Sequence, residues 1–161
     1  MQLTNTKNIP SEQLTQFFKT HWGSTEMVIS SGVYDCIKLD GFAMINEATE
    51  IIGLITYIVR EKECEIISLD SIQEGKGIGT RLIQAAETAA KESNCSQMKL
   101  ITTNDNLHAL KFYQKRGYYL AKLHRNAVEK ARERKPSIPL TGNDGIPIRD
   151  ELELEKVLSG N

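Results

Sequence analysis

The segment EGKGIG, residues 74–79, decides the fold. The residues before it, up to Asp70, are typical of a β-strand, whereas apolar residues after it recur with helical spacing, at Ile78, Leu82, Ala85, Ala86 and Ala89. Glycines at alternate positions allow the backbone to turn sharply and a ligand to approach the main chain closely. The segment therefore predicts a tight connection from a strand into a helix.

The start of this predicted helix suits an anion. The first-turn N–H groups of a helix lack partners within the helix, and the positive end of the helix dipole lies behind them. With the main chain of Gly75, Gly77 and Gly79, they predict a turn that binds a pyrophosphate. A tight turn that holds no ligand is the alternative that these residues leave open.

Two other phosphate-binding motifs do not fit this segment. A Walker loop needs four residues between its glycines and then Gly-Lys-Ser/Thr, an order that is absent here. The dinucleotide fingerprint needs Gly or Ala at position 80, where this chain has Thr80.

The sequence on the N-terminal side of the turn predicts an antiparallel meander. Residues 42–46, 50–60 and 63–70 are rich in β-branched and aromatic residues and are joined by short polar turns. A weak strand is expected at residues 2–6, and a helix at residues 12–19 with Ser11 as its N-cap.

On the C-terminal side the order continues as strand, helix, strand. Met98–Thr103 reads as a strand, Asn106–Arg116 as a helix that Gly117 ends, and Tyr118–His124 as a further strand. This mixed order predicts an α/β fold with a partly antiparallel sheet, and a length of 161 residues suits a single domain, 1–161.

Two motifs resemble the GNAT superfamily of N-acetyltransferases. The acetyl-CoA loop of that superfamily is similar to Gly75-Lys76-Gly77-Ile78-Gly79, and its second signature is similar to Asn106, Ala109, Tyr113 and Gly117-Tyr118. The resemblance implies a mixed, mostly antiparallel twisted sheet flanked by helices, and acetyl-CoA as cosubstrate. It also implies that acetyl-CoA is held by residues Ile67, Leu69, Gly75, Lys76, Gly77, Ile78, Gly79, Thr80, Asn106, Ala109 and Tyr113. One departure is Glu74, where Gln or Arg is usual.

The implied reaction is direct attack of a primary amine on acetyl-CoA in a ternary complex. The amine needs a base, and we expect Glu63 and Glu65 to share one strand face with Ile67 and Leu69, with Glu65 favoured because it lies nearer the turn. Three alternatives remain open. Glu63 could be the base, a water could mediate the proton transfer, or both acids could lie at the surface without a catalytic role. Tyr113 resembles the general acid, although a core tyrosine is the competing interpretation. Cys64, on the opposite face with no base beside it, is a poor covalent nucleophile.

An unusual excursion is expected at about residues 124–148, before the last strand. Residues 122–135 carry six basic and two acidic side chains, and residues 144–156 carry five acids and two bases. We expect both clusters to be solvated, and the strand at 148–158 to alternate Leu152 and Leu154 against exposed glutamates. The excursion either shapes the acceptor site or serves as a structural cap or a contact in a homodimer.

Composition limits the remaining function classes. A net charge of −1 argues against a nucleic-acid partner, and the longest apolar stretch, Ile51 to Val59, is too short to span a membrane. The three cysteines lack paired spacing, which favours a reducing, cytoplasmic setting and no metal site. A small-molecule or peptide amine is the expected acceptor. A non-catalytic acyl-CoA-binding or regulatory module is the alternative function.

Overall fold

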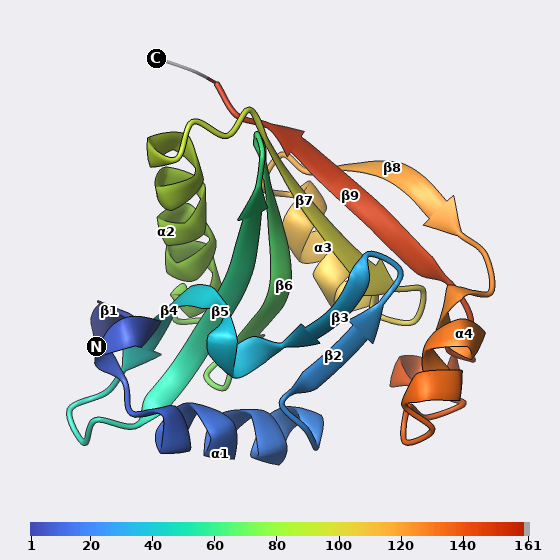
Figure 1. The fold of residues 1–161 in the computed structure, drawn as a ribbon, viewed down its shortest axis with the longest axis horizontal. Coiled ribbons are helices and arrows are strands. Elements are labelled where there is room, and N and C mark those ends of the chain that lie inside the picture. The colour runs from blue at the N-terminus through green and yellow to red at the C-terminus, as the bar shows by residue number, and fades with distance from the viewer. Residues whose placement is uncertain (160–161) are drawn as a thin grey trace. The chain divides into compact units, whose positions relative to one another are not determined.

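The computed structural model describes residues 1–159 (Figure 1). Nine strands lie in this range, at Gln2–Asn5 (β1), Glu26–Ile29 (β2), Gly32–Asp35 (β3), Asp40–Ile45 (β4), Ile51–Arg60 (β5), Glu63–Ser71 (β6), Gln97–Thr103 (β7), Tyr119–His124 (β8) and Glu151–Val157 (β9). The four α-helices are Ser11–Trp22 (α1), Ile78–Glu92 (α2), Leu107–Gln114 (α3) and Ala127–Arg134 (α4). Short 3-10 helices occupy Thr6–Asn8 (η1), Cys36–Lys38 (η2) and Asn143–Gly145 (η3).

The chain forms two compact units that interleave in sequence. Unit 1 comprises residues 1–27, 35–98 and the C-terminal residues from Leu158, whereas unit 2 comprises residues 28–34 and 99–157. Because the chain passes between the units several times, neither is a simple N- or C-terminal half. The single domain expected from the sequence stays a prediction.

Unit 1 is built on four antiparallel strands in the order β1-β4-β5-β6. Helix α2 packs against β4, β5 and β6, with Ile78, Leu82, Ile83, Ala86 and Ala90 buried. A close approach at Gly53 fixes this packing, because a Cβ there would lie 2.4 Å from Ile78 Cγ2 and 3.0 Å from Leu82 Cδ1. Gly53 and every second residue after it therefore point towards α2.

The other face of these strands receives a contact from α1. Asp70 pairs with Leu54, the neighbour of Gly53, and so points away from α2. There the Trp22 Nε1–H donates to Asp70 Oδ2 at 2.7 Å. Burial raises the pKa of the Asp70 carboxyl, while this hydrogen bond and the charge of His21 oppose the rise. Unit 1 thus carries α2 on one face and polar side chains on the other.

A one-residue bulge in β6 changes which side chains share a face. Thr56 pairs with Ser68 and Tyr57 with Ile66, so Ile67 is the extra residue. Glu65 pairs with Ile58, two residues from Thr56, and therefore shares its face with Ser68. Leu69 pairs with Ile55 and points to the α2 side. The prediction that Glu63, Glu65, Ile67 and Leu69 lie on one face is wrong, because period-two alternation stops at the bulge.

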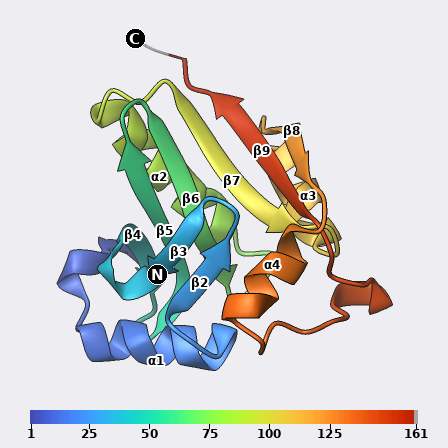
Figure 2. The same ribbon diagram turned by 45° about the vertical axis from the view of Figure 1, so that its right-hand side comes forward.

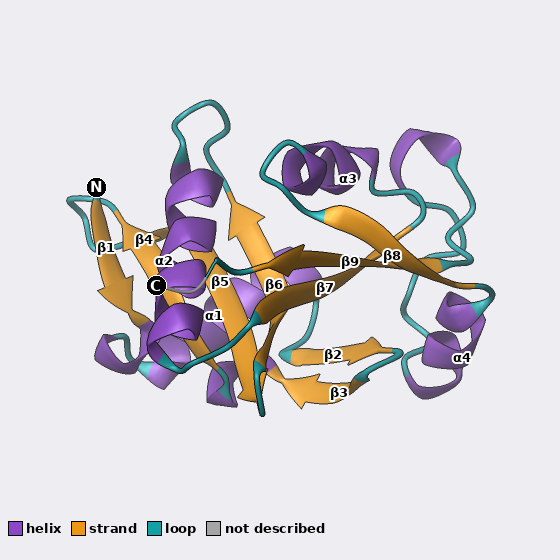
Figure 3. Cartoon of the chain, turned by 90° about the horizontal axis from the view of Figure 1, so that it is seen from above, coloured by secondary structure: helices purple, strands orange, loops and turns teal. Residues whose placement is uncertain are grey.

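Unit 2 is built on β7, β9 and β8, with β9 between the other two. Lys156 of β9 extends to the α3–β8 connection, with Cε 3.4 Å from the Cβ position of Gly117 and Nζ over the Tyr118 ring. Glu151 alternates to the opposite face and contacts Ser30 in the β2–β3 turn. Figure 3 shows α3 on one side of β9 and this turn on the other.

Figure 2 shows the excursion between β8 and β9, which contains α4. Polar contacts hold this excursion in place. The Arg132 guanidinium donates to the carbonyls of Ile138, Pro139 and Ile148, at 3.2, 2.6 and 2.7 Å. The Asn104 side chain accepts from the main-chain N–H groups of Arg149 and Asp150, and the Asp105 carboxylate accepts from that of Asn143. The excursion is therefore fastened to the loop that precedes α3.

The predicted fold class, an α/β fold with a mostly antiparallel twisted sheet flanked by helices, is confirmed. The N-cap of α1 is Pro10, so the prediction of Ser11 is wrong by one residue. A larger error concerns β9, where Glu151 and Glu153 are buried rather than solvated. In residues 1–159 no helix combines the length and apolar character needed to cross a membrane.

The contact of Gly53 with α2 gives a test of the packing. We expect Gly53→Ala to lower the free energy of unfolding by about 1–3 kcal/mol, because the added methyl group overlaps Ile78. Urea unfolding followed by circular dichroism measures the change. The control Val157→Ala, at a side chain that is 68% exposed, should stay within about 0.5 kcal/mol of the parent protein. Equal effects of the two substitutions would contradict the close packing of α2 on β5.

Candidate functional site

The predicted strand-to-helix turn is present, and its backbone needs two of its glycines. Gly75 has φ +76° and Gly77 has φ +70°, a left-handed conformation that side chains disfavour. A Cβ at either position would meet no heavy atom within 4 Å, so open space lies beside the main chain. Conformation and not tight packing therefore requires glycine at both places.

This turn fits a diphosphate. Gly77 is the N-cap of α2, and it offers no side chain to accept from the first-turn N–H groups. Residues 71–77 are exposed, and Ile78 anchors the start of the helix in the core. The residues predicted from Gly75 to Thr80 thus lie together at an open helix N-terminus, where the helix dipole favours negative charge.

The second predicted group lies on α3 in unit 2. Asn106 is the N-cap of α3, and its Oδ1 accepts from the Ala109 N–H at 3.1 Å. Asn106 therefore stabilises the start of α3 as its N-cap. The Asn106 Nδ2 has no hydrogen-bond partner within residues 1–159, so this donor is available to a ligand.

Tyr113 is the last of the signature residues Asn106, Ala109 and Tyr113 along α3. Its side chain is largely buried, with 6% exposed. Its ring packs edge-to-face against Phe112 and Tyr118, with centroids 5.2 and 5.4 Å away. Both interpretations of Tyr113 are compatible with this setting, because a phenol fixed by aromatic neighbours is part of the core and also has a defined direction.

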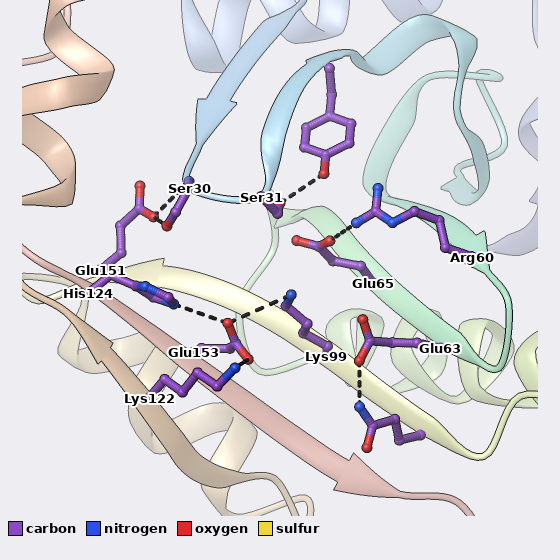
Figure 4. Close-up of polar contacts among 12 residues, drawn as sticks. Ser30, Ser31, Arg60, Glu63, Glu65, Lys99, Lys122, His124, Glu151 and Glu153 are labelled. Carbon is purple, nitrogen blue, oxygen red and sulfur yellow. Dashed lines mark hydrogen bonds and ion pairs between the residues drawn. The ribbon is translucent and has the colours of Figure 1, made fainter.

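The two candidate bases of β6 have different environments. Glu65 is 1% exposed, and the Arg60 guanidinium donates to its Oε1 (Figure 4). Glu63 is half-buried, and the Gln97 side-chain amide donates to its Oε2. The expectation that both acids are superficial is wrong for Glu65. Arg60 is a site residue that the sequence analysis missed, because the contact runs diagonally across the β5–β6 hairpin.

A second group of charged residues was also missed, on β7, β8 and β9. Glu153 is 3% exposed and lies among Lys99 Nζ at 3.7 Å, Lys122 Nζ at 4.0 Å and His124 Nε2 at 3.1 Å (Figure 4). Burial alone would raise the pKa of the Glu153 carboxyl, but His124 and the two lysines outweigh burial and lower this pKa. The alternation of glutamate and leucine gave no signal of this burial.

With this geometry in place, the comparison with known proteins decides the family. The sequence pattern of the acetyltransferase (GNAT) family matches residues 10–118. The chain belongs to the GNAT acetyltransferase family. Both predicted signatures, the glycine turn and the α3 stripe, fall within the matched range, and the predictions of the family and of an acyltransferase are confirmed.

Individual proteins and solved structures are also similar to this chain. The chain is 58% identical over 158 residues to the uncharacterised protein YxbD of Bacillus subtilis (strain 168), which covers 98% of this chain and 99% of that one. Its fold is similar to that of an IAA acetyltransferase from Bacillus cereus, with TM-score 0.70, 20% identity, and 98% and 100% of the two chains covered. It is also similar to that of a Bacillus subtilis acetyltransferase in complex with CoA, with TM-score 0.69, 16% identity, and 98% and 99% covered.

The basic groups around Glu153 predict how the stability of the folded protein changes with pH. Because the pKa of Glu153 is lower in the folded state, its ionised form stabilises the fold above the unfolded-state pKa, and this contribution is lost as the pH falls through both values. We expect Glu153→Gln to be less stable than the parent protein at pH 7, and the difference to shrink in acid, below about pH 4. Thermal unfolding between pH 3 and pH 8 measures both effects.

The matched control is Glu133→Gln on the exposed surface of α4. It should leave the pH profile of stability unchanged. If the stability difference between Glu153→Gln and the parent protein were the same at every pH, the basic groups would not lower the pKa of Glu153, and the explanation would be wrong.

Proposed function

We propose that this GNAT protein transfers the acetyl group of acetyl-CoA to a primary amine by direct attack in a ternary complex. The observation that carries the proposal is that each of the two signatures, taken in its own unit, has local geometry suited to part of acetyl-CoA. An open, uncapped helix N-terminus follows Gly75 and Gly77, and an N-capped α3 presents Asn106, Ala109 and Tyr113 along one stripe. A CoA complex of a protein with this fold supports acetyl-CoA as the donor.

The donor supplies an activated acyl thioester, and the chain's own groups would hold it. The first-turn N–H groups of α2 and the side chain of Lys76 are suited to its diphosphate. The Asn106 Nδ2 is suited to an amide of its pantetheine arm. Ile67 is the bulge residue of β6 and Leu69 follows it, and the interrupted strand pairing there is proposed to leave main-chain N–H groups for an acyl oxygen.

The acceptor must lose a proton before it attacks. An alkylammonium with a pKa near 10.4 is neutral only to about 0.04% at pH 7. Glu65 is proposed as the base, directly or through a water, because it is the buried acid of the strand that leads to the glycine turn. Tyr113 is proposed to return a proton to the sulfur that leaves.

A covalent route through Cys64 is disfavoured by its environment. The side chain has no exposed surface, and burial, with the nearby Cys95 second, raises the pKa of the Cys64 thiol to about 12. Only about one thiol in 10⁵ would be ionised at pH 7, and the thiolate is the nucleophile.

This gives a prediction for Cys64. We expect the native protein to show no alkylation of Cys64 by iodoacetamide at pH 7.5, and Cys64→Ala to retain turnover within about two-fold, since no step uses the thiol. Mass spectrometry of tryptic peptides reads the labelling. Recovery of an acetyl group on Cys64 after reaction with acetyl-CoA would contradict direct attack.

The proposed roles are tested by release of free CoA thiol from acetyl-CoA with a broad set of primary amines. We expect Tyr113→Phe and Glu65→Gln each to lower kcat by about 100-fold, the usual size of a general acid or base contribution.

Two neighbours provide matched controls. Tyr119 is 48% exposed on β8, and Glu63 is the half-buried acid two residues from Glu65, so Tyr119→Phe and Glu63→Gln should turn over normally. Binding of acetyl-CoA without thiol release for every amine would favour the non-catalytic module. Normal rates in Tyr113→Phe or Glu65→Gln would remove that residue from the chemistry.

The cellular location of the protein and the role of the excursion at 124–148 are also part of this proposal. The cysteines Cys36, Cys64 and Cys95 are all free, which is compatible with the proposed reducing, cytoplasmic location. The excursion at 124–148 is proposed to shape the acceptor site. Deletion of residues 126–146 that left acceptor kinetics unchanged in a folded protein would exclude that role.

A further inference from the structure

Strand β9 carries two buried carboxylates that are compensated very differently. Glu151 and Glu153 are two residues apart on the face of β9 that points away from α3, and both are at most 3% exposed. Glu153 has three basic groups within 4.0 Å. Figure 4 shows that Glu151 instead faces Ser30.

The Glu151 carboxylate receives only neutral donors. Its Oε1 accepts from the Ser30 N–H at 2.9 Å and from the Ser30 hydroxyl. Within residues 1–159 no Lys, Arg or His forms an ion pair with Glu151, and its Oε2 has no hydrogen-bond partner there. Every fully enclosed side-chain oxygen of the described residues does have a partner, so Oε2 must keep a small contact with solvent.

This arrangement lacks a positive charge. Removing a carboxylate from water is costly, and the cost is offset well only by an opposite charge with good hydrogen bonds. An ionised carboxylate has about four acceptor positions, of which Ser30 fills two on one oxygen. The positions on Oε2 are directed to a donor that the described chain does not provide.

We propose that Glu151 binds an ammonium group of the acceptor, and that this group is not the amine that is acetylated. A carboxylate beside an amine favours its charged form, whereas the attacking amine has to be neutral. The group held at Glu151 is therefore a second, permanently protonated amine. This inference rests on the proposed acetyl transfer and narrows its acceptor to a diamine or polyamine.

The position of Glu151 in unit 2 suits this role. Asn106 and Tyr113 belong to α3, which lies on one side of β9 (Figure 3), and strand alternation places Glu151 on the opposite face of β9. A group bound at Glu151 therefore does not compete with a donor held by α3. Ser30 is an exposed residue in the turn of the two-stranded β2–β3 hairpin.

The test compares diamines with monoamines of the same length. The probes are 1,4-diaminobutane, 1,6-diaminohexane, 1-aminobutane and 1-aminohexane, at matched ionic strength, with acetyl-CoA for turnover and CoA for thermal unfolding. The variant is Glu151→Gln, which keeps the acceptor for Ser30 but removes the charge. Glu133→Gln, an exposed acid of α4, is the control.

We expect the parent protein and Glu133→Gln to prefer at least one diamine over its monoamine. In Glu151→Gln we expect kcat/KM for that diamine to fall by about 10- to 100-fold, the range for loss of a charge-assisted hydrogen bond, and kcat/KM for the monoamine to change by less than about two-fold. The diamine should raise the Tm of the parent protein and not that of Glu151→Gln.

Two readouts separate the inference from the proposed function. Equal Tm shifts by the diamine in the parent protein and Glu151→Gln, or an unchanged preference for diamines, would overturn the role of Glu151 and leave acetyl transfer intact. A Tm shift that depends on Glu151, without thiol release for any amine, would support the diamine site and reject acetyl transfer. Should Glu151→Gln fail to fold, Ser30→Ala replaces it and should weaken diamine binding by about three- to ten-fold.

Discussion

Compensation of buried carboxylates is the constraint on which the arrangement of this GNAT protein depends. Glu65, Glu151 and Glu153 are each at most 3% exposed, although ionised side chains are rarely buried without partners. Arg60 compensates Glu65, and three basic groups surround Glu153. Within residues 1–159, Glu151 has Ser30 as its one hydrogen-bond partner. Glu65 and Glu153 are thus compensated by opposite charge, whereas Glu151 receives neutral donors.

In each unit the buried acids point away from the helix that carries a family signature. In unit 1 the glycine turn leads into α2, whereas Glu65 points away from α2. In unit 2 Tyr113 belongs to α3, whereas Glu151 points to the Ser30 side. Each unit, taken by itself, thus keeps groups suited to an anionic donor apart from carboxylates suited to a cationic group.

The sequence was sufficient for features that depend on neighbours along the chain. Gly75 and Gly77 were predictable because the left-handed turn into α2 requires glycine, and the Asn106 cap follows from its position before α3. The bulge at Ile67 was not predictable, since its residues are ordinary strand formers. Burial of Glu151 was also hidden, because Ser30, which covers it, lies 121 residues away. Alternating Glu and Leu normally indicates a solvated face.

Direct attack requires the amine to react with acetyl-CoA while both are bound, with no acetyl group resting on the protein. Initial rates measured over a grid of acetyl-CoA and amine concentrations distinguish this route from a covalent one. A ternary complex gives double-reciprocal lines that intersect, and this is the expected result. Parallel lines, the pattern of a covalent acetyl-enzyme, would contradict it.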